Sequence, residues 1–243
     1  VMRFATGFGT DAAFEMALAK LRERGATLVD IKEFDDSAIG GNEFEVLLYE
    51  FKAGLNDYLR STPAPIPLRT LADVIAFNER HQAQEMPLFG QEIFLDAQKK
   101  GGLGDTAYRD ARRKSFQAAG PNGIDRLLKA HNVVALVGPT MPPAWKIDAA
   151  NGDQFPGAGA GSLAAVAGYP HLTVPMGMVK GLPVGLSFLG PKWSEALLLS
   201  LGYAYEQARG PFPAPQLLPS IEASPLVAPL LEPQRLTGPA ATP

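Results

Sequence analysis

The sequence contains no cysteine and no large excess of charge of either sign. Because cysteine is absent from all 243 residues, disulfide frameworks, thiolate metal sites and a cysteine nucleophile are excluded. Lysine and arginine number 22 and aspartate and glutamate 25, which gives a net charge of −3. That balance lacks the basic excess that attracts phosphate backbones, so we expect no nucleic-acid partner. The three histidines lie far apart and in no ligand motif, and we therefore predict no metal site.

A long uninterrupted hydrophobic run is also missing. Lys180 is the only charged residue between Gln154 and Pro191, but prolines interrupt this stretch at positions 156, 170, 175 and 183. A membrane-spanning helix needs about 18 to 20 predominantly apolar residues in a row. We therefore expect this stretch to be buried inside protein, and we expect no membrane partner. The sequence does not indicate a compartment.

The patterns that are present alternate between strand and helix and predict an α/β fold. Residues 1–6 and 27–32 are typical of strands on either side of a helix at 11–24, which makes a βαβ unit with a parallel pair. Helical patterns follow at 43–60, 70–84, 88–98, 105–119 and 124–130, and Gly120-Pro121 is expected to break the last two apart. The remaining patterns predict a strand at 133–138, a helix at 161–168, a hairpin of strands at 172–176 and 184–189, and a helix at 193–209.

These elements predict a mixed, mostly buried sheet with covering helices, in a domain that is incomplete. The domain is expected to span residues 1–209, with a helical insertion at about 43–130. Residues 210–243 hold nine of the 22 prolines and are predicted to form a proline-rich tail. The first residue is Val1 rather than methionine, and we expect the chain to be a portion of a longer protein.

Two glycine-rich segments are candidate sites. Gly7, Gly9 and Asp30 outline a dinucleotide fingerprint, in which a pyrophosphate binds at a helix N-terminus and a carboxylate binds the ribose. The other interpretation is an ordinary turn between a strand and a helix. Residues 155–162 can present backbone N–H groups to a substrate, or their glycines can serve only close packing. No serine lies in a G-x-S-x-G motif or precedes a lysine by three positions.

The order of several segments resembles the amidase signature family. The resemblance is carried by residues 168–177 (GYPHLTVPMG), 181–190 (GLPVGLSFLG) and 195–206, and upstream by 89–92 (FGQE) and by Pro139-Thr140 with Pro142-Pro143. It covers residues 1–209 and matches the C-terminal part of the family. Phe155-Pro156 and residues 162–170 (SLAAVAGYP) are most similar to the peptide amidase branch.

The resemblance implies hydrolysis of carboxamide C–N bonds, in peptide amides or small acyl amides, through an acyl-enzyme. Family members use two serines and a neutral lysine, but this sequence has no Gly-Gly-Ser-Ser-Gly run and no lysine that matches the family base. No catalytic residue is therefore assigned. Substrate contacts are expected at Phe155, Gly159 and Ser162. The implied partners are the N-terminal half of the same enzyme and the amide substrate, without a cofactor, and the isolated chain is expected to be inactive.

Two alternatives remain open at this point. One is a dinucleotide-binding module that uses Gly7, Gly9 and Asp30. The other is a non-catalytic scaffold that retains the amidase fold. Saturable binding of NAD that is lost in Asp30→Ala would favour the first, whereas a natural start at Val1 would favour the second.

Overall fold

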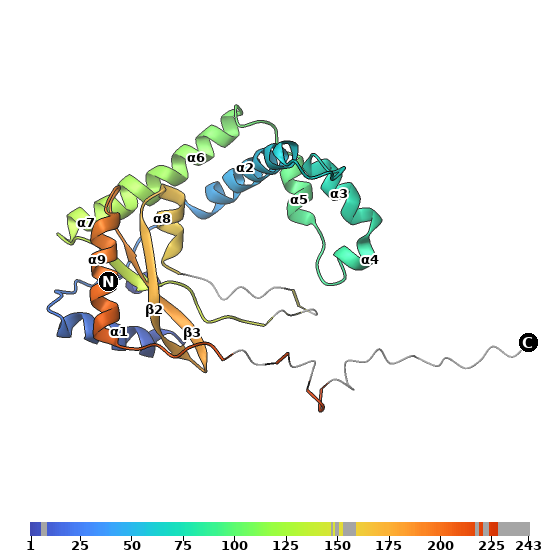
Figure 1. The fold of residues 1–243 in the computed structure, drawn as a ribbon. Coiled ribbons are helices and arrows are strands. Elements are labelled where there is room, and N and C mark those ends of the chain that lie inside the picture. Colours follow the sequence, from blue (N-terminus) through green and yellow to red (C-terminus); the bar gives the residue numbers. More distant parts are fainter. Residues whose placement is uncertain are drawn as a thin grey trace, which may run out of the picture. The chain divides into compact units, whose positions relative to one another are not determined.

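The computed structural model describes residues 1–5, 9–146, 148, 151–152, 159–216, 219–220 and 224–227. The chain divides into two units, Val1–Gly210 and Pro211–Pro243. The helices and strands named below belong to the first unit. Figure 1 shows this unit as a small sheet with helices on both of its sides and further helices that extend from it.

The sheet has three antiparallel strands in the order β1-β3-β2. They are β1 (Leu136–Pro139), β2 (His171–Val179) and β3 (Leu182–Leu189). A tight turn joins β2 to β3, with a positive φ at both Lys180 (49°) and Gly181 (80°), as two-residue hairpin turns of this type require. The hairpin predicted from the sequence is confirmed. A register shift between Pro175 and Gly177 bends β2 at its middle.

The two strands predicted at 1–6 and 27–32 are wrong in extent. Residues Arg3–Ala5 form a 3₁₀ turn, η1, and the parallel pairing consists of the single bridge between Met2 and Ile31. The Met2 N–H also donates to the Val137 carbonyl at 2.7 Å. The turn that starts at Arg3 takes the chain out of the ladder after one pair, so these segments border the β1 edge without forming full strands.

One face of the sheet is covered by two helices. They are α1 (Asp11–Glu23) and α9 (Glu195–Arg209), which lie against β2 and β3 (Figure 1). The core between them contains Phe14, Leu186, Phe188, Leu198 and Tyr205, each at most 2% exposed. We refer to this side as the covered face. Its strand residues alternate with outward-facing ones, as expected for an antiparallel sheet.

The opposite face is covered only at one end by described helices. There α8 (Gly161–Ala167) and α7 (Arg126–Ala130) pack over Leu136 and Leu189 in a second core that includes Leu127 and Leu163. The break predicted at Gly120-Pro121 is wrong. Helix α6 (Thr106–Ala119) continues through a π-helical turn, η2 (Gly120–Asp125), into α7. Pro121 lies at the junction, where the α-helical pattern of α6 has ended at Ala119 and the wider π-helical turn begins.

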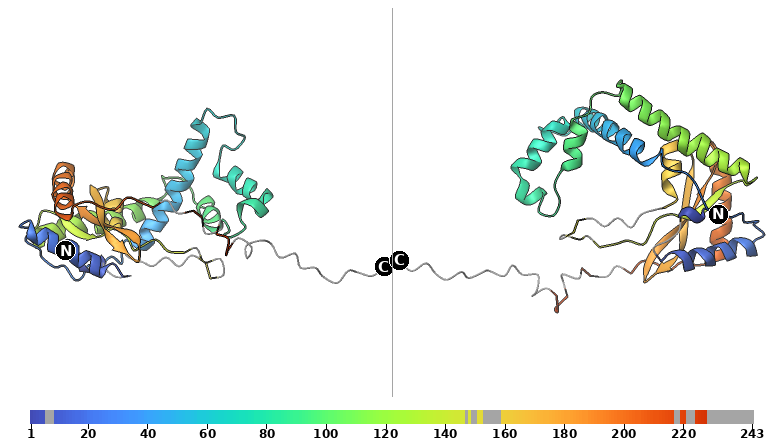
Figure 2. Two further views of the ribbon diagram at one scale, coloured as in Figure 1. Left: turned by 60° about the horizontal axis from the view of Figure 1, so that its bottom comes forward. Right: turned by 180° about the vertical axis from the view of Figure 1, so that it is seen from behind.

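Four further helices extend from the sheet and form what we call the helical arm (Figure 2). They are α2 (Gly40–Ser61), α3 (Leu71–Arg80), α4 (Gln82–Glu85) and α5 (Glu92–Gln98). Their core is small and consists of Leu48, Leu71, Ile75 and Ala97. Helix α3 begins with a capping box in which Thr70 and Asp73 satisfy each other's backbone N–H groups.

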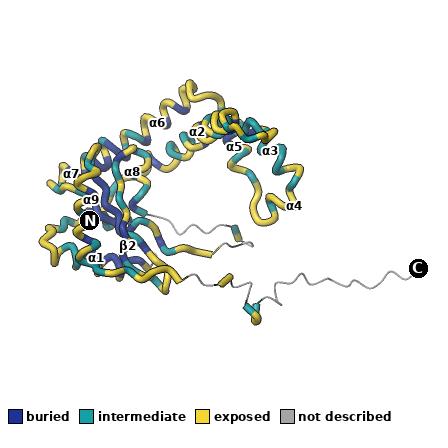
Figure 3. The backbone as a smooth tube through the Cα atoms, viewed as in Figure 1, coloured by how far each residue is buried: buried dark blue, intermediate teal, exposed yellow. Residues whose placement is uncertain are grey.

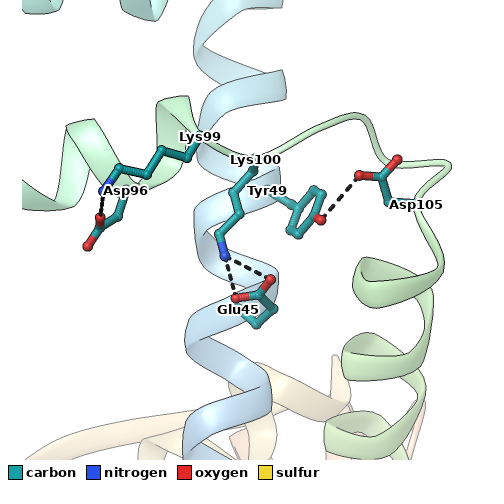
Figure 4. A network of polar contacts seen from close by, with 6 residues as sticks. All are labelled: Glu45, Tyr49, Asp96, Lys99, Lys100 and Asp105. Carbon is teal, nitrogen blue, oxygen red and sulfur yellow. Dashed lines mark hydrogen bonds and ion pairs between the residues drawn. The ribbon is translucent and has the colours of Figure 1, made fainter.

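Polar side chains join the arm to the start of α6 (Figure 4). The Lys100 ammonium contacts both carboxylate oxygens of Glu45 on α2, at 2.7 and 2.8 Å, and the Tyr49 hydroxyl donates to Asp105 at 3.2 Å. Asp105 occupies the position before α6, but its side chain makes no capping bond to that helix. Lys99, by contrast, pairs with Asp96 on the arm's surface.

Candidate functional site

Gly159 and Ser162, two of the three predicted substrate contacts, lie beside the end of β1. The Ala160 N–H donates to the carbonyls of Pro139 and Thr140, at 3.0 and 3.2 Å, and this holds the start of α8 against the strand. A side chain at Gly159 would collide with the Thr140 carbonyl oxygen, so the close approach requires glycine. Ser162 is exposed in the first turn of α8. The third predicted contact, Phe155, lies outside the described residues.

Both residues line one pocket of about 190 Å³. Its apolar lining includes Phe4, Phe34, Ile39 and Leu163, and its polar lining includes Asp36, Glu43 and Ser162. Burial raises the pKa of the Glu43 carboxyl above its ordinary value. Gly159 and Ser162 therefore border one concavity, whose apolar walls and few polar groups are of the kind found in small-molecule sites.

A larger cavity of about 400 Å³ lies between α2, α6 and α8 and shares Glu43 with the first pocket. Its lining is mainly apolar, including Val46, Leu47, Phe116 and Val166, and Arg112 and Glu50 lie at its wall. The Glu50 carboxylate accepts a hydrogen bond from the Tyr108 hydroxyl at 2.7 Å, which raises the pKa of Tyr108. No sequence motif pointed to this cavity, because helices from three separate segments form it.

A network of hydroxyl groups spans the three strands on the side opposite the covered face. The Ser187 hydroxyl donates to Thr140 Oγ1 at 2.8 Å, and Thr140 and Thr173 share a hydrogen bond of 2.6 Å. His171 Nε2 lies 2.6 Å from Ser187 Oγ. Sequence reasoning missed this network, although His171 and Thr173 alternate on β2 and Ser187 pairs directly with Thr173. The two-residue spacing of His171 and Thr173 was the signal in the sequence that could have placed them on one face of the sheet.

The contact between Ser187 and His171 joins a side chain of the nucleophile type to one of the base type. Burial lowers the pKa of His171, which favours the neutral ring that a general base requires. Ser187, however, is completely buried, and no carboxylate among the described residues bonds His171. A serine–histidine pair of this kind lacks both substrate access and the orienting group of a catalytic triad.

The structure does not provide the strand that a dinucleotide-binding fingerprint at Gly7 and Gly9 needs before its glycines. Gly7 lies outside the described residues, and the segment before it is a 3₁₀ turn rather than the strand that the fingerprint needs. The Asp30 carboxylate is paired with the Arg3 guanidinium at 3.2 Å, and Arg3 also contacts Glu15. Asp30 is therefore held in an ion pair, on a segment that forms only one bridge.

The described residues form neither a metal-binding cluster nor a membrane-spanning helix. Within those ranges, no three side chains of the histidine, aspartate and glutamate types gather in a way that could hold a metal ion. In the same ranges, no helix is both long enough and apolar enough to cross a membrane. His81 has a structural environment, because its Nδ1 contacts the Phe77 carbonyl at 2.9 Å and its ring stacks on Phe77.

Comparison with known proteins gives a consistent set of relatives. The Amidase family model matches residues 4–199. A crystal structure of a peptide amidase in complex with the inhibitor chymostatin is 49% identical, has a TM-score of 0.78 and matches 86% of this chain. The native peptide amidase of Stenotrophomonas maltophilia is 48% identical, with a TM-score of 0.75 over 84% of this chain. A protein named probable amidase from Arabidopsis thaliana is 35% identical over 77% of this chain.

The chain spans well under half the length of these relatives. It covers 42% and 41% of the two peptide amidase structures and 34% of the Arabidopsis protein. More than half of each relative therefore lies outside the region that this chain matches.

Proposed function

We propose that this chain, which belongs to the amidase family, is the C-terminal part of an enzyme that hydrolyses carboxamide C–N bonds, in peptide amides or small acyl amides. The observation that carries the proposal is the match to peptide amidases at 48–49% identity with TM-scores of 0.75–0.78. In this proposal residues 1–209 form a portion of the amidase domain, with the helical insertion at about 43–130.

The proposed reaction is the acyl-enzyme route of the family, with two serines and a lysine contributed by polypeptide outside this chain. The first serine hydroxyl loses its proton, through the second serine, to the neutral lysine, and its oxygen attacks the amide carbonyl carbon. Collapse of the tetrahedral intermediate breaks the C–N bond, and the leaving nitrogen takes up a proton. Water then attacks the acyl-enzyme ester, which releases the carboxylic acid and restores the serine.

This chain would contribute the wall of the acyl pocket. We place the substrate contacts at Phe155, Gly159 and Ser162. The support for Gly159 and Ser162 is the pocket that they share with Phe4 and Phe34, whose apolar walls suit an uncharged side chain of the substrate. Glu43, whose pKa burial raises, lies at the same pocket.

The test compares the chain alone with a chimeric protein. In the chimera, this chain replaces the matching region of the Stenotrophomonas maltophilia peptide amidase. Release of ammonia from a dipeptide amide is measured for both. We expect turnover by the chimera and none above the buffer blank for the chain alone. Turnover by the chain alone at a rate comparable to the full-length peptide amidase would refute the proposal.

A variant of the chain alone identifies the source of any activity that it shows. Loss of that activity in Ser187→Ala would assign it to the Ser187–His171 pair, and the proposed mechanism would then be wrong. A chimera that folds, but neither turns over nor binds the dipeptide amide, would instead favour the non-catalytic scaffold. The inhibitor chymostatin, which occupies a peptide amidase structure, is a suitable binding probe for that decision.

A further inference from the structure

The β2–β3 hairpin has an exposed side that no described helix covers beyond its α8 end. We call it the open face and define it by Thr140, Thr173, Pro175, Met178, Pro183 and Gly185. The hydrogen bonds of Thr140 with Thr173 and Ser187, and the pairing of Pro175 with Gly185 and of Met178 with Pro183, place these residues together. Thr173, Pro175 and Pro183 are exposed, and Met178 is 44% exposed. Figure 3 shows the exposed end of the hairpin in yellow.

The chemistry of the open face is unusual for a surface in water. An antiparallel sheet with one side in solvent normally alternates apolar residues inside with charged and polar residues outside. Neither β2 nor β3 contains a single lysine, arginine, aspartate or glutamate. Partial desolvation lowers the pKa of His171, at the edge of the face, and so disfavours its charged form. The face therefore presents prolines, a methionine and hydroxyls where solvated charges are expected.

The hydroxyls of the face are satisfied by one another. Thr173, Thr140, Ser187 and His171 form a continuous chain of hydrogen bonds of 2.6–2.8 Å across the strands. Closure of this chain depends on Gly185, because a Cβ there would lie 2.6 Å from Thr173 Oγ1 and 2.7 Å from Thr140 Oγ1. Hydroxyls that already bond one another lose fewer hydrogen bonds to water when an interface covers them.

The edge of β2, in contrast, is poorly suited to pairing with another strand. β2 lies at the end of the strand order, but Pro175 removes a backbone donor and the bulge after it bends the strand. Both features hinder the addition of another strand at the edge of a sheet. A partner is therefore expected to pack on the face rather than extend the ladder along the whole edge.

We propose that the open face is the surface on which the remaining part of an amidase chain docks, and that the Thr140–Thr173–Ser187 network is buried at that interface. The inference rests on the proposed function. Its occupant follows from the lengths, because matched relatives carry more than half of their chain outside the region that this one spans. A neutral face with its hydroxyls already paired suits an uncharged partner surface better than solvent.

The experiment co-expresses the tagged chain with the part of the Stenotrophomonas maltophilia peptide amidase that this chain does not match. The tagged wild-type chain is expected to recover that part in a near-stoichiometric complex. Thr173→Lys is expected to lower recovery at least about tenfold, which corresponds to about 1.4 kcal/mol, because a charge would be buried without a partner. Met16→Lys is the matched control, since Met16 is 63% exposed on α1, on the other side of the sheet, and recovery should not change.

A second variant and a fold measurement keep the test decisive. Thr173 and Pro183 are both exposed, so Thr173→Lys and Pro183→Lys should keep the far-ultraviolet spectrum of the wild-type chain and lower its melting temperature by no more than a few degrees. If one of them does not fold, the other decides. Recovery that both lysine variants leave unchanged would overturn the proposal, as would failure of the wild-type chain to capture the peptide amidase part. A chain that forms dimers, which Thr173→Lys dissociates, without capturing that part would show that a second copy is the occupant.

The activity of the captured complex separates this inference from the proposed function. A complex that forms and is disrupted by Thr173→Lys, but hydrolyses no peptide amide, would leave the docking surface standing and remove the proposed activity. If both lysine variants recover the full amount of complex and that complex still hydrolyses the peptide amide, the docking surface would be wrong and the proposed activity would stand.

Discussion

The two faces of the β2–β3 hairpin differ although the same strands build them. On the covered face, Leu186 and Phe188 are sealed by α1 and α9 and are at most 1% exposed. On the open face, Thr173 and Pro175 of the neighbouring strand are exposed, and polar contacts replace hydrophobic burial. The difference teaches that the covered face holds this chain together, whereas the open face adds little to its stability. The following predictions test that division.

The largest effect is expected in the covered face. Phe188→Ala removes a ring that is 1% exposed and packs against Tyr205, and we expect a loss of about 3–5 kcal/mol in the free energy of unfolding. Thr173→Ala, on the open face, should lower it by about 1 kcal/mol or less. Urea unfolding of both variants measures the contrast. Similar losses for the two would show that the faces do not differ in this way.

A medium effect is expected in the helical arm, where two adjacent lysines provide the same contrast between covered and exposed. The side chain of Lys100 is 22% exposed and pairs with Glu45, whereas that of Lys99 is 73% exposed and pairs with Asp96 (Figure 4). Lys100→Met should lower the free energy of unfolding by about 1 kcal/mol, because Glu45 then loses its partner. Lys99→Met should change it by at most about 0.5 kcal/mol. A larger loss in Lys99→Met than in Lys100→Met would contradict the structure.

The smallest effect concerns His171 at the edge of the open face. Because burial lowers its pKa from an ordinary value of 6.5, the unfolded chain binds more protons than the folded chain below that pH. Its contribution to stability is therefore complete above pH 6.5 and decreases as the pH falls below it. Urea unfolding at about pH 7.5 and about pH 5.5 should show a smaller decrease for His171→Gln than for wild type. An equal decrease in both would show that His171 is not the group responsible.

Much of the fold was predictable from local patterns. The hairpin at β2 and β3 followed from two β-branched and apolar runs around Lys180-Gly181, and α1, α8 and α9 lie within a few residues of their predicted positions. The strands at 1–6 and 27–32 were not predictable in extent, because apolar composition does not reveal that a turn begins at Arg3. The helix break at Gly120-Pro121 failed for a related reason, since packing against α8 stabilises a wider turn that local propensity disfavours.

The candidate site was predictable only in part. Gly159 and Ser162 were predicted as substrate contacts from glycine content and family resemblance; the structure brings them to one pocket, and their role stays a prediction. The other walls of that pocket, Phe34 and Glu43, come from segments more than a hundred positions earlier, and no local pattern relates them. The hydroxyl network was hidden for the same reason, because Thr140 reaches Ser187 only through strand pairing.

The unbroken helical path from α6 through η2 to α7 has a mechanical consequence. It runs from Asp105, where the arm is fastened, to Ile124 and Leu127, which lie in the core beneath α8. The π-helical turn that contains Pro121 is the point at which such a path bends most easily. Any movement of the arm that neither this turn nor residues 99–105 absorb reaches Tyr169, whose hydroxyl donates to Asp125 at 2.7 Å, two residues before β2 begins.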